Sequence, residues 1–261
     1  MTSTTRISLA EGTELIRDTL TAAGATIEAS TSVADALIAA EAEGQVGHGF
    51  SRLGDYVAQL RSGKINPNAG IRTMSQYAAS ILIDADCGFA YPALDAARSA
   101  VIPVAEDLGI AIVGITNSHH CGALSVQVDR IARAGLIGLM VANAPKAIAP
   151  WGAHEPLFGT NPIAFAVPRD GADPLVIDLS LSKVARGKVM NAYKNGQDIP
   201  EGWALDAAGA PTTNAKAALE GTMLPIGGAK GTALALMVEI LSAMFNGASA
   251  SYQATSFFDP S

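Results

Sequence analysis

The sequence is poor in cysteine, and this scarcity already restricts its class. Among 261 residues only two cysteines occur, Cys87 and Cys121, and they form no CxxC pair. A scaffold held by disulfides and a structural zinc site are therefore excluded. The pattern is typical of a protein of the cytoplasm, where thiols stay reduced.

Positive charge is also scarce, since 17 Lys and Arg face 24 Asp and Glu for a net charge of -7. Nucleic-acid binding needs a basic face, so we expect no nucleic-acid partner. The most apolar run, Gly231 to Phe245, contains Glu239 and is too short to cross a bilayer. Met1 to Ser8 has no apolar core of the signal-peptide kind. We therefore expect no membrane association and a cytoplasmic location.

Several common catalytic and nucleotide-binding signatures are absent. No GxGxxG follows a strand pattern, and neither GxxxxGK[ST] nor GxSxG occurs. His154-Glu155 begins like the zinc-protease motif HExxH, but Phe158 stands where the second histidine belongs. If a dinucleotide binds, it binds without a standard Rossmann fingerprint.

Hydrophobic residues are plentiful at 49%, and their spacing predicts helices followed by a mixed α/β region. Ser8 and Glu11 fit a capping box for a first helix that ends near Gly24, and two more helices are expected over Ser32–Glu43 and from about Phe50 to Gly63. After Pro67, short β-branched runs alternate with Ala-rich helical stretches. The expected strands are Ile81–Ile83, Ile110–Ile115, Ile137–Val141, Ile163–Val167 and Leu175–Ile177, and the expected helices are Pro92–Leu108, Ser125–Ala134, Val184–Tyr193 and Thr232–Phe245.

His48 and Arg52 form the first candidate site. His48 lies between two glycines just before the third helix, and Arg52 follows about one turn later. A titratable imidazole beside a fixed cation suits protonation of a carbonyl or imine while a carboxylate is held. The alternative, which spacing alone favours, is that His48 caps the helix and Arg52 is a solvated surface charge.

Three glycine-containing loops are further candidates. Ser118–Ala123 joins an expected strand to a helix, so its N–H groups are suited to an anion. Its adjacent histidines rarely converge on one ion and have no supporting ligand, so we expect no metal site. Gly159–Pro162 and Gly227–Gly231 allow close approach of a ligand to the backbone, but they are equally compatible with ordinary turns.

Six segments in this order are more specific than any one of them: HGFSRLGDYVAQLRSGKI, NSHHCGAL, PLFGTNPIAFAVP, VIDLSLSKVARGKV, IPEGWALDAAGAPTT and LPIGGAKGTALALMVEIL. Together they resemble the type-2 malate/L-lactate dehydrogenase family, which includes sulfolactate and ureidoglycolate dehydrogenases and piperideine/pyrroline-2-carboxylate reductases. The resemblance runs from about Leu9 to the C-terminus. It implies an NAD(P)-dependent oxidoreductase, a homodimer, and a mixed-sheet cofactor domain of non-Rossmann type packed with an N-terminal helical domain.

Site residues follow from the same resemblance. His48 and His120 are implied as the residues that move the proton, and Arg52 as the residue that binds the substrate carboxylate. Thr160 and Asn161 would line the substrate pocket, to which Lys188 is also assigned. The implied cofactor-site residues are His120, Cys121, Gly122, Ala123, Leu124, Asn143, Asp178, Leu179, Ser180 and Lys230.

The sequence departs from the family pattern at three places. Gly47 replaces a serine that many members carry, and Lys188 stands where the cyclic-imine reductases tend to have an acidic residue. A cation there favours an acid with a second negative group. Members also usually continue for several tens of residues beyond Ser261. We therefore expect residues 1–75 to form the helical substrate and dimer region, and residues 76–261 to form an α/β cofactor domain without the last segment of the family fold.

The predicted function is the interconversion of a small 2-oxo acid and 2-hydroxy acid of the malate, lactate or sulfolactate type, with NAD or NADP as cofactor. One alternative is a cyclic-imine reductase, because Gly88–Ala90 and the Ser118–His120 loop resemble those enzymes. A second alternative is a catalytically silent relative that only binds the dinucleotide.

Overall fold

The computed structural model describes residues 6–260. Residues 1–5, which make up most of the segment judged to lack a signal-peptide core, lie outside the described part, as does residue 261. The chain folds into two compact units, of which unit 1 comprises residues 1–134 together with 257–261, and unit 2 comprises residues 135–256. Across residues 6–260, no helix combines the length and apolar character needed to cross a membrane.

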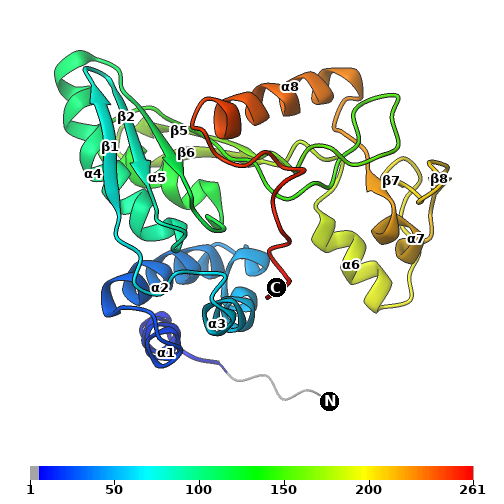
Figure 1. Cartoon of the computed structure of the whole chain (residues 1–261), viewed down its shortest axis with the longest axis horizontal. Coiled ribbons are helices and arrows are strands. Elements are labelled where there is room, and N and C mark those ends of the chain that lie inside the picture. The colour runs from blue at the N-terminus through cyan, green and yellow to red at the C-terminus, as the bar shows by residue number, and fades with distance from the viewer. Residues whose placement is uncertain (1–5, 261) are drawn as a thin grey trace. The chain divides into compact units, whose positions relative to one another are not determined.

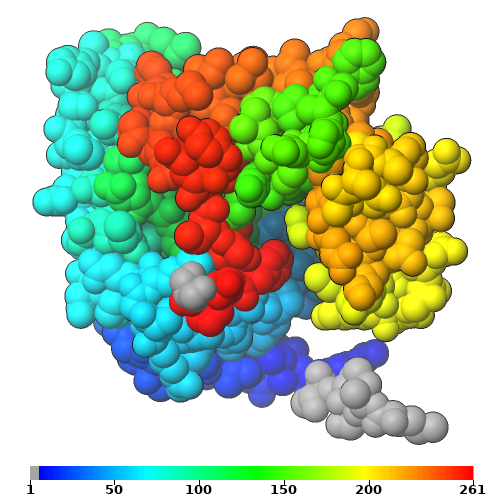
Figure 2. Space-filling model, turned by 45° about the vertical axis from the view of Figure 1, so that its right-hand side comes forward, coloured from blue at the N-terminus to red at the C-terminus, as the bar shows by residue number. Residues whose placement is uncertain are grey.

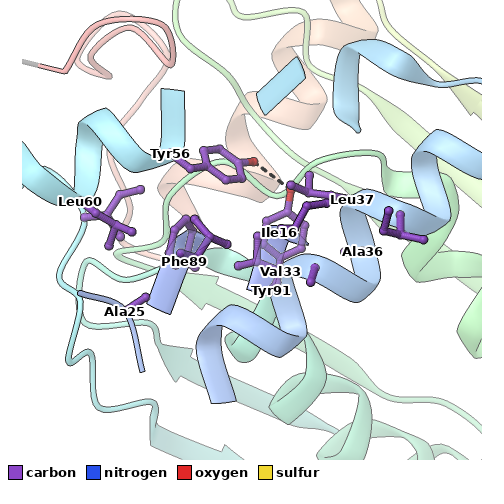
Figure 3. Close-up of a cluster of buried hydrophobic side chains, with 13 residues drawn as sticks. Ile16, Ala25, Val33, Ala36, Leu37, Tyr56, Leu60, Phe89 and Tyr91 are labelled. Carbon is purple, nitrogen blue, oxygen red and sulfur yellow. Dashed lines mark hydrogen bonds between the residues drawn. The ribbon is translucent and has the colours of Figure 1, made fainter. Parts of the chain in front are cut away.

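Unit 1 begins with three helices that share one core. Their bounds, with two short 3₁₀ turns between the second and third, are α1 Leu9–Ala22, α2 Ile27–Ala42, η1 Val46–His48, η2 Phe50–Arg52 and α3 Leu53–Ser62. Figure 3 shows their apolar side chains meeting around Leu37 and Tyr56, both almost fully buried. The predicted capping box of Ser8 and Glu11 is confirmed, and Gly63 ends α3 in the left-handed conformation.

The second helix begins earlier than predicted. The Thr26 side chain accepts a hydrogen bond from the backbone N–H of Ala29, so α2 starts at Ile27 and not at Ser32. The apolar spacing that begins at Val33 had hidden this first turn, because its residues are mostly polar.

A three-stranded sheet completes unit 1. Its elements are β1 Arg72–Tyr77, β2 Ser80–Asp84, α4 Ala90–Leu108, β3 Ile112–Thr116 and α5 Leu124–Arg133. β1 pairs antiparallel and β3 parallel with β2. Figure 1 shows α4 along this sheet, where its alanines pack against Ile81 and Ile83. β1 was not predicted, because its side chains are mostly exposed and lack an apolar alternation.

Unit 2 contains two small sheets and three helices. Its elements are β4 Gly138–Val141, β5 Ile163–Arg169, β6 Ala172–Leu179, α6 Arg186–Lys194, β7 Ala204–Leu205, β8 Pro211–Thr212, α7 Ala215–Glu220, β9 Thr222–Met223 and α8 Ala229–Glu239, followed by the π-helical turn η3 Ile240–Met244. Strands β4, β5 and β6 are antiparallel. Ile148, Leu181 and Val238 belong to the core of unit 2. The helix predicted over Thr232–Phe245 thus has an α part and a π part, with Glu239 at the change.

Candidate active site

The turn that carries His48 and Arg52 is fixed from two sides. The Glu41 carboxylate, on α2, accepts a hydrogen bond of 2.9 Å from the backbone N–H of Phe50. A Cβ at Gly49 would meet that carboxylate, so a larger residue there would displace the Glu41 side chain. Arg52 Nε donates 2.7 Å to the carbonyl of Gly47. The predicted pairing of His48 with Arg52 is therefore built into one folded turn.

His120 lies beside His48. It belongs to the loop between β3 and α5, and only 8% of its surface is exposed. The two imidazole rings are nearly parallel, with 5.7 Å between their centroids and 16° between their planes. The structure thus brings together the two histidines that the sequence assigned to proton transfer.

Two buried tyrosines hold the other side of His120. The Tyr56 hydroxyl, on α3, lies 2.7 Å from Nδ1 of His120 and 2.9 Å from the hydroxyl of Tyr91 on α4. The dashed line in Figure 3 joins these two hydroxyls. Since the hydrogen bond occupies Nδ1, Nε2 is the nitrogen left for exchange of a proton with a substrate.

Burial controls the charge of this group. Desolvation lowers the pKa of His120 well below its usual range, and the nearby Arg52, His48 and His119 lower it further. Desolvation likewise raises the pKa of Tyr56 and of Tyr91 above the usual range of tyrosine. At neutral pH the imidazole of His120 and both phenols are therefore uncharged.

Arg52 has the geometry of an anion-binding group. Its side chain is 12% exposed, and its Nη1 lies 3.6 Å from the Asp55 carboxylate. That Nη1 is buried and has no hydrogen-bond partner. Phe258 lies against the guanidinium, 4.5 Å from its ring centroid to Cζ. A substrate carboxylate would supply the missing acceptor.

His119, next to His120, had no predicted role. Its ring packs edge-on against Tyr56, Phe89 and Phe257, and both ring nitrogens are buried without hydrogen bonds. Desolvation lowers its pKa to about 4, with Lys64 and Arg52 adding to the effect. His119 is therefore a neutral, apolar-packed histidine under ordinary conditions.

The residues of unit 1 implied at the cofactor site, His120–Leu124, precede and open α5. This helix begins without a side-chain cap, and the positive end of its dipole is suited to an anion. Gly122 has φ of 70°, and a Cβ there would meet the Tyr91 hydroxyl. The left-handed backbone and the packing of Tyr91 therefore both favour glycine at this position.

In unit 2, three predicted segments meet around Leu181. The backbone N–H of Leu181 donates to the carbonyl of Thr160, and its carbonyl accepts from Ile226, just before the glycine loop. Ser180 bonds the hydroxyl of Ser182 at 3.0 Å. Lys230 is the second residue of α8, which also begins without a side-chain cap. A helix N-terminus without a side-chain cap beside a lysine fits an anionic ligand.

The other predicted residues of unit 2 have the following environments. Asn143 donates to the carbonyl of Ser249, while Asp178 and Leu179 are exposed at the end of β6. Lys188 is exposed on α6. Within residues 6–260 no group of three metal-binding side chains occurs.

Asn161 has a structural environment that the sequence did not indicate. It is fully buried with φ of 40°, and its amide donates to the carboxylate of Glu239 and to the carbonyl of Ala235. Ser251 donates to the same carboxylate through N–H and hydroxyl. This side chain fixes the loop that contains Thr160, and the substrate contact expected of Asn161 stays a prediction.

Sequence reasoning missed Tyr56, Tyr91 and the segment Phe257–Asp259 as parts of the site. Tyr56 has a usable signal, since it lies four residues after Arg52 on the same helical face. Its residue type, however, fits a buried helix face equally well. Tyr91 and Phe257 had no local signal, because their contacts with the site come from distant segments.

Comparison with known proteins places the chain in a family. Residues 7–261 match the family model described as malate/L-lactate dehydrogenase. The chain is 52% identical to a (2R)-3-sulfolactate dehydrogenase (NADP(+)) of Chromohalobacter salexigens, over 97% of this chain and 76% of the relative. It is 39% identical to a Delta(1)-pyrroline-2-carboxylate/Delta(1)-piperideine-2-carboxylate reductase of Pseudomonas syringae pv. tomato, over 96% of this chain and 73% of the relative.

Solved structures agree with these relatives. The delta1-piperideine-2-carboxylate reductase from Pseudomonas syringae superposes with a TM-score of 0.94 at 39% identity, covering 97% of this chain and 76% of that one. The sulfolactate dehydrogenase from Methanocaldococcus jannaschii gives a TM-score of 0.90 at 33% identity, covering 97% and 73%. The mixed α/β fold predicted from the sequence is confirmed by these similarities.

The chain belongs to the malate/L-lactate dehydrogenase family. It is an NAD(P)-dependent oxidoreductase, as the resemblance of its motifs had implied.

Proposed function

We propose that this oxidoreductase interconverts a small 2-oxo acid and the matching 2-hydroxy acid, with 3-sulfopyruvate and 3-sulfolactate as the first candidates and NADP(H) as the first candidate cofactor. The observation that carries the proposal is the turn that sets the unsatisfied Nη1 of Arg52 beside the paired rings of His48 and His120. A carboxylate binder and a proton-transfer group at adjacent positions are what a 2-hydroxy acid requires. The 52% identity to a sulfolactate dehydrogenase supports the substrate class.

Each residue has a defined task in this proposal. Arg52 binds the substrate carboxylate and orients the neighbouring carbon. His120 exchanges a proton with the substrate oxygen at Nε2, while Tyr56 holds its Nδ1. His48, stacked on His120, is the alternative proton carrier. When bound, the reduced nicotinamide supplies the hydride that the substrate carbon accepts.

The remaining predicted residues are proposed to complete the two binding sites. Thr160, Asn161 and Lys188 are assigned to the substrate, with Lys188 facing a second negative group. The cofactor is assigned to the backbone of His120–Leu124 and to Asn143, Asp178, Leu179, Ser180 and Lys230. We further propose that residues 1–75 serve the substrate and a homodimer interface, that residues 76–261 serve the cofactor, and that the protein is cytoplasmic without nucleic-acid or membrane partners.

A cyclic-imine reductase is the second candidate, because a structure of that type superposes with a TM-score of 0.94. The same arginine and histidines would bind the carboxylate and protonate the ring nitrogen. Lys188 favours the first candidate instead, because a cation at this position suits a 2-oxo acid that carries a second negative group.

A single assay separates the candidates. Oxidation of NADPH and of NADH is followed with 3-sulfopyruvate, oxaloacetate, pyruvate and pyrroline-2-carboxylate under identical conditions. The proposal expects the highest kcat/KM with a 2-oxo acid. A clear preference for the ring imine would establish the second candidate. Tight dinucleotide binding with no turnover of any substrate, unchanged in His48→Ala, would mean a silent binding relative.

A further inference from the structure

Three residues near the C-terminal end of the described chain return to unit 1 and lie on α3. The buried side chain of Gln59, 1% exposed, donates 2.9 Å to the carbonyl of Phe257 and 3.4 Å to that of Asp259. Lys64 Nζ donates 2.7 Å to the carbonyl of Asp259. Figure 2 shows this red segment against the blue and cyan atoms of unit 1. All three contacts are made to main-chain carbonyls.

These backbone contacts place two aromatic rings on the site. The ring of Phe257 lies 4.9 Å from the centroid of His120 and 5.7 Å from that of His119. The ring of Phe258 stacks on the guanidinium of Arg52. The two groups assigned to proton transfer and carboxylate binding are therefore each covered by one phenylalanine.

We propose that Phe257 is a specificity-determining residue, held by Gln59 as a positioning residue, and that its ring limits the substrate to 2-oxo acids with a compact side group. The inference rests on the proposed function. A substrate whose carboxylate binds Arg52 and whose oxygen reaches His120 has one remaining substituent on the reacting carbon. Near His120 that substituent meets the ring of Phe257, because this ring already lies against the imidazole.

Gln59 is essential to this arrangement for a physical reason. The Gln59 side chain, on α3, is buried, and its amide donates to carbonyls of a distant segment. Removing this amide leaves those carbonyls without their donor. The position of the phenyl ring follows from the main chain that Gln59 holds. Tight packing of a rigid ring discriminates by size, and one methylene in such a pocket changes kcat/KM by about 10- to 200-fold.

The test compares substrates of different size in the full chain. We measure kcat/KM for 4-methyl-2-oxopentanoate, which is bulky, relative to the compact acid turned over best among pyruvate, oxaloacetate and 3-sulfopyruvate. We expect Phe257→Ala to raise this ratio by about 10-fold or more, and Phe257→Leu to raise it less. Gln59→Leu, similar in volume but without donors, should move the ratio in the same direction.

The control is Tyr252→Ala, which removes an exposed aromatic ring of unit 2 and is expected to leave the ratio unchanged. If Phe257→Ala and Phe257→Leu both keep the wild-type ratio, the specificity role is wrong while the proposed function stands. An unchanged ratio in Gln59→Leu alone would remove the positioning role. A wild-type protein that turns over none of the 2-oxo acids would overturn the proposed function, and this inference with it.

Discussion

The imidazole rings of His48 and His120 lie nearly parallel at 5.7 Å, although they come from different parts of the chain. We expect His48→Ala and His120→Ala each to lower kcat by about 100-fold or more, the usual size of a general acid–base contribution. The double variant should be little worse than the more severe single variant, because groups that act as a unit are not additive. Steady-state kinetics measure all three, and far-UV circular dichroism verifies folding. Wild-type kinetics in both single variants would refute the site.

The buried position of His120 predicts a pH profile. Oxidation of the hydroxy acid needs a neutral imidazole as base, and desolvation together with Arg52, His48 and His119 lowers the pKa of His120. The titratable groups beside it also include Tyr56, which is hydrogen-bonded to Nδ1, and Tyr91, which is hydrogen-bonded to Tyr56. We therefore expect kcat/KM for oxidation to stay constant down to about pH 6.5 and to fall only below the ordinary histidine range. A fall centred at or above that pH would contradict the assignment.

Arg52 is expected to contribute to binding more than to chemistry. Its Nη1 lacks a hydrogen-bond acceptor in the protein, so a substrate carboxylate gains a charge-assisted hydrogen bond there. We expect Arg52→Ala to raise KM and to lower kcat/KM by about 10- to 100-fold, with a smaller change in kcat. Arg52→Lys keeps the charge but loses the planar donor pair, and it should be intermediate. Unchanged KM in Arg52→Ala would place the carboxylate elsewhere.

The hydroxyl of Tyr56 connects His120 to Tyr91. Tyr56→Phe keeps the ring but leaves two buried polar atoms without a partner, which costs about 1–3 kcal/mol of unfolding free energy. We also expect kcat to fall, since Nδ1 of His120 is no longer held. Urea unfolding and steady-state kinetics measure the two effects. The matched control is Tyr77→Phe, whose ring is 74% exposed and whose change should leave both quantities at wild-type values.

The lowered pKa of His119 predicts that the free energy of unfolding decreases at acidic pH. Its pKa is lowered from 6.5 to about 4 in the folded chain, so between these values the unfolded chain binds more protons. The stability contributed by the neutral ring is present above about pH 6.5 and is lost as the pH falls toward 4. The linkage amounts to about 2 kcal/mol between pH 7.5 and pH 5.

Urea unfolding of His119→Leu and wild type at both pH values tests this linkage. On acidification, the free energy of unfolding of His119→Leu should decrease by about 2 kcal/mol less than that of wild type. His154→Leu, a change at an exposed histidine, should behave as wild type. Equal acid sensitivity of His119→Leu and wild type would show that another group is responsible.

Local signals explain which elements were predictable. The capping box of Ser8 and Glu11 and the left-handed Gly63 are encoded within one turn of the helices they end, so the sequence located α1 and α3. The strand over Ile163–Val167 was found because its apolar residues are contiguous. β1 has no such run, and its place is set by pairing with β2, a contact that periodicity does not report.

The candidate site also contains residues that local sequence signals could indicate and residues that they could not. His48 and Arg52 lie in one turn, so spacing predicted that they are neighbours, but only the family motifs assigned them a role at a site, and the same motifs pointed to His120. The hydrogen bond from Tyr56 to His120 and the packing of Phe257 on that ring join segments far apart in sequence. Asn161 shows the converse, since the sequence pointed to a ligand contact there and gave no sign of the hydrogen bond to the buried Glu239.

Because residues 135–256 intervene between α5 and Phe257, the order of synthesis matters for the site. The ribosome produces His48, His120, Arg52, Tyr56 and Tyr91 before any of unit 2, and Phe257 only after all of it. At typical translation rates this interval is roughly ten seconds, long compared with the folding of a small domain. During this interval the nascent chain has no Phe257 to cover His120 or to accept the hydrogen bond of Gln59, so this part of the site is completed only after unit 2 has been synthesised.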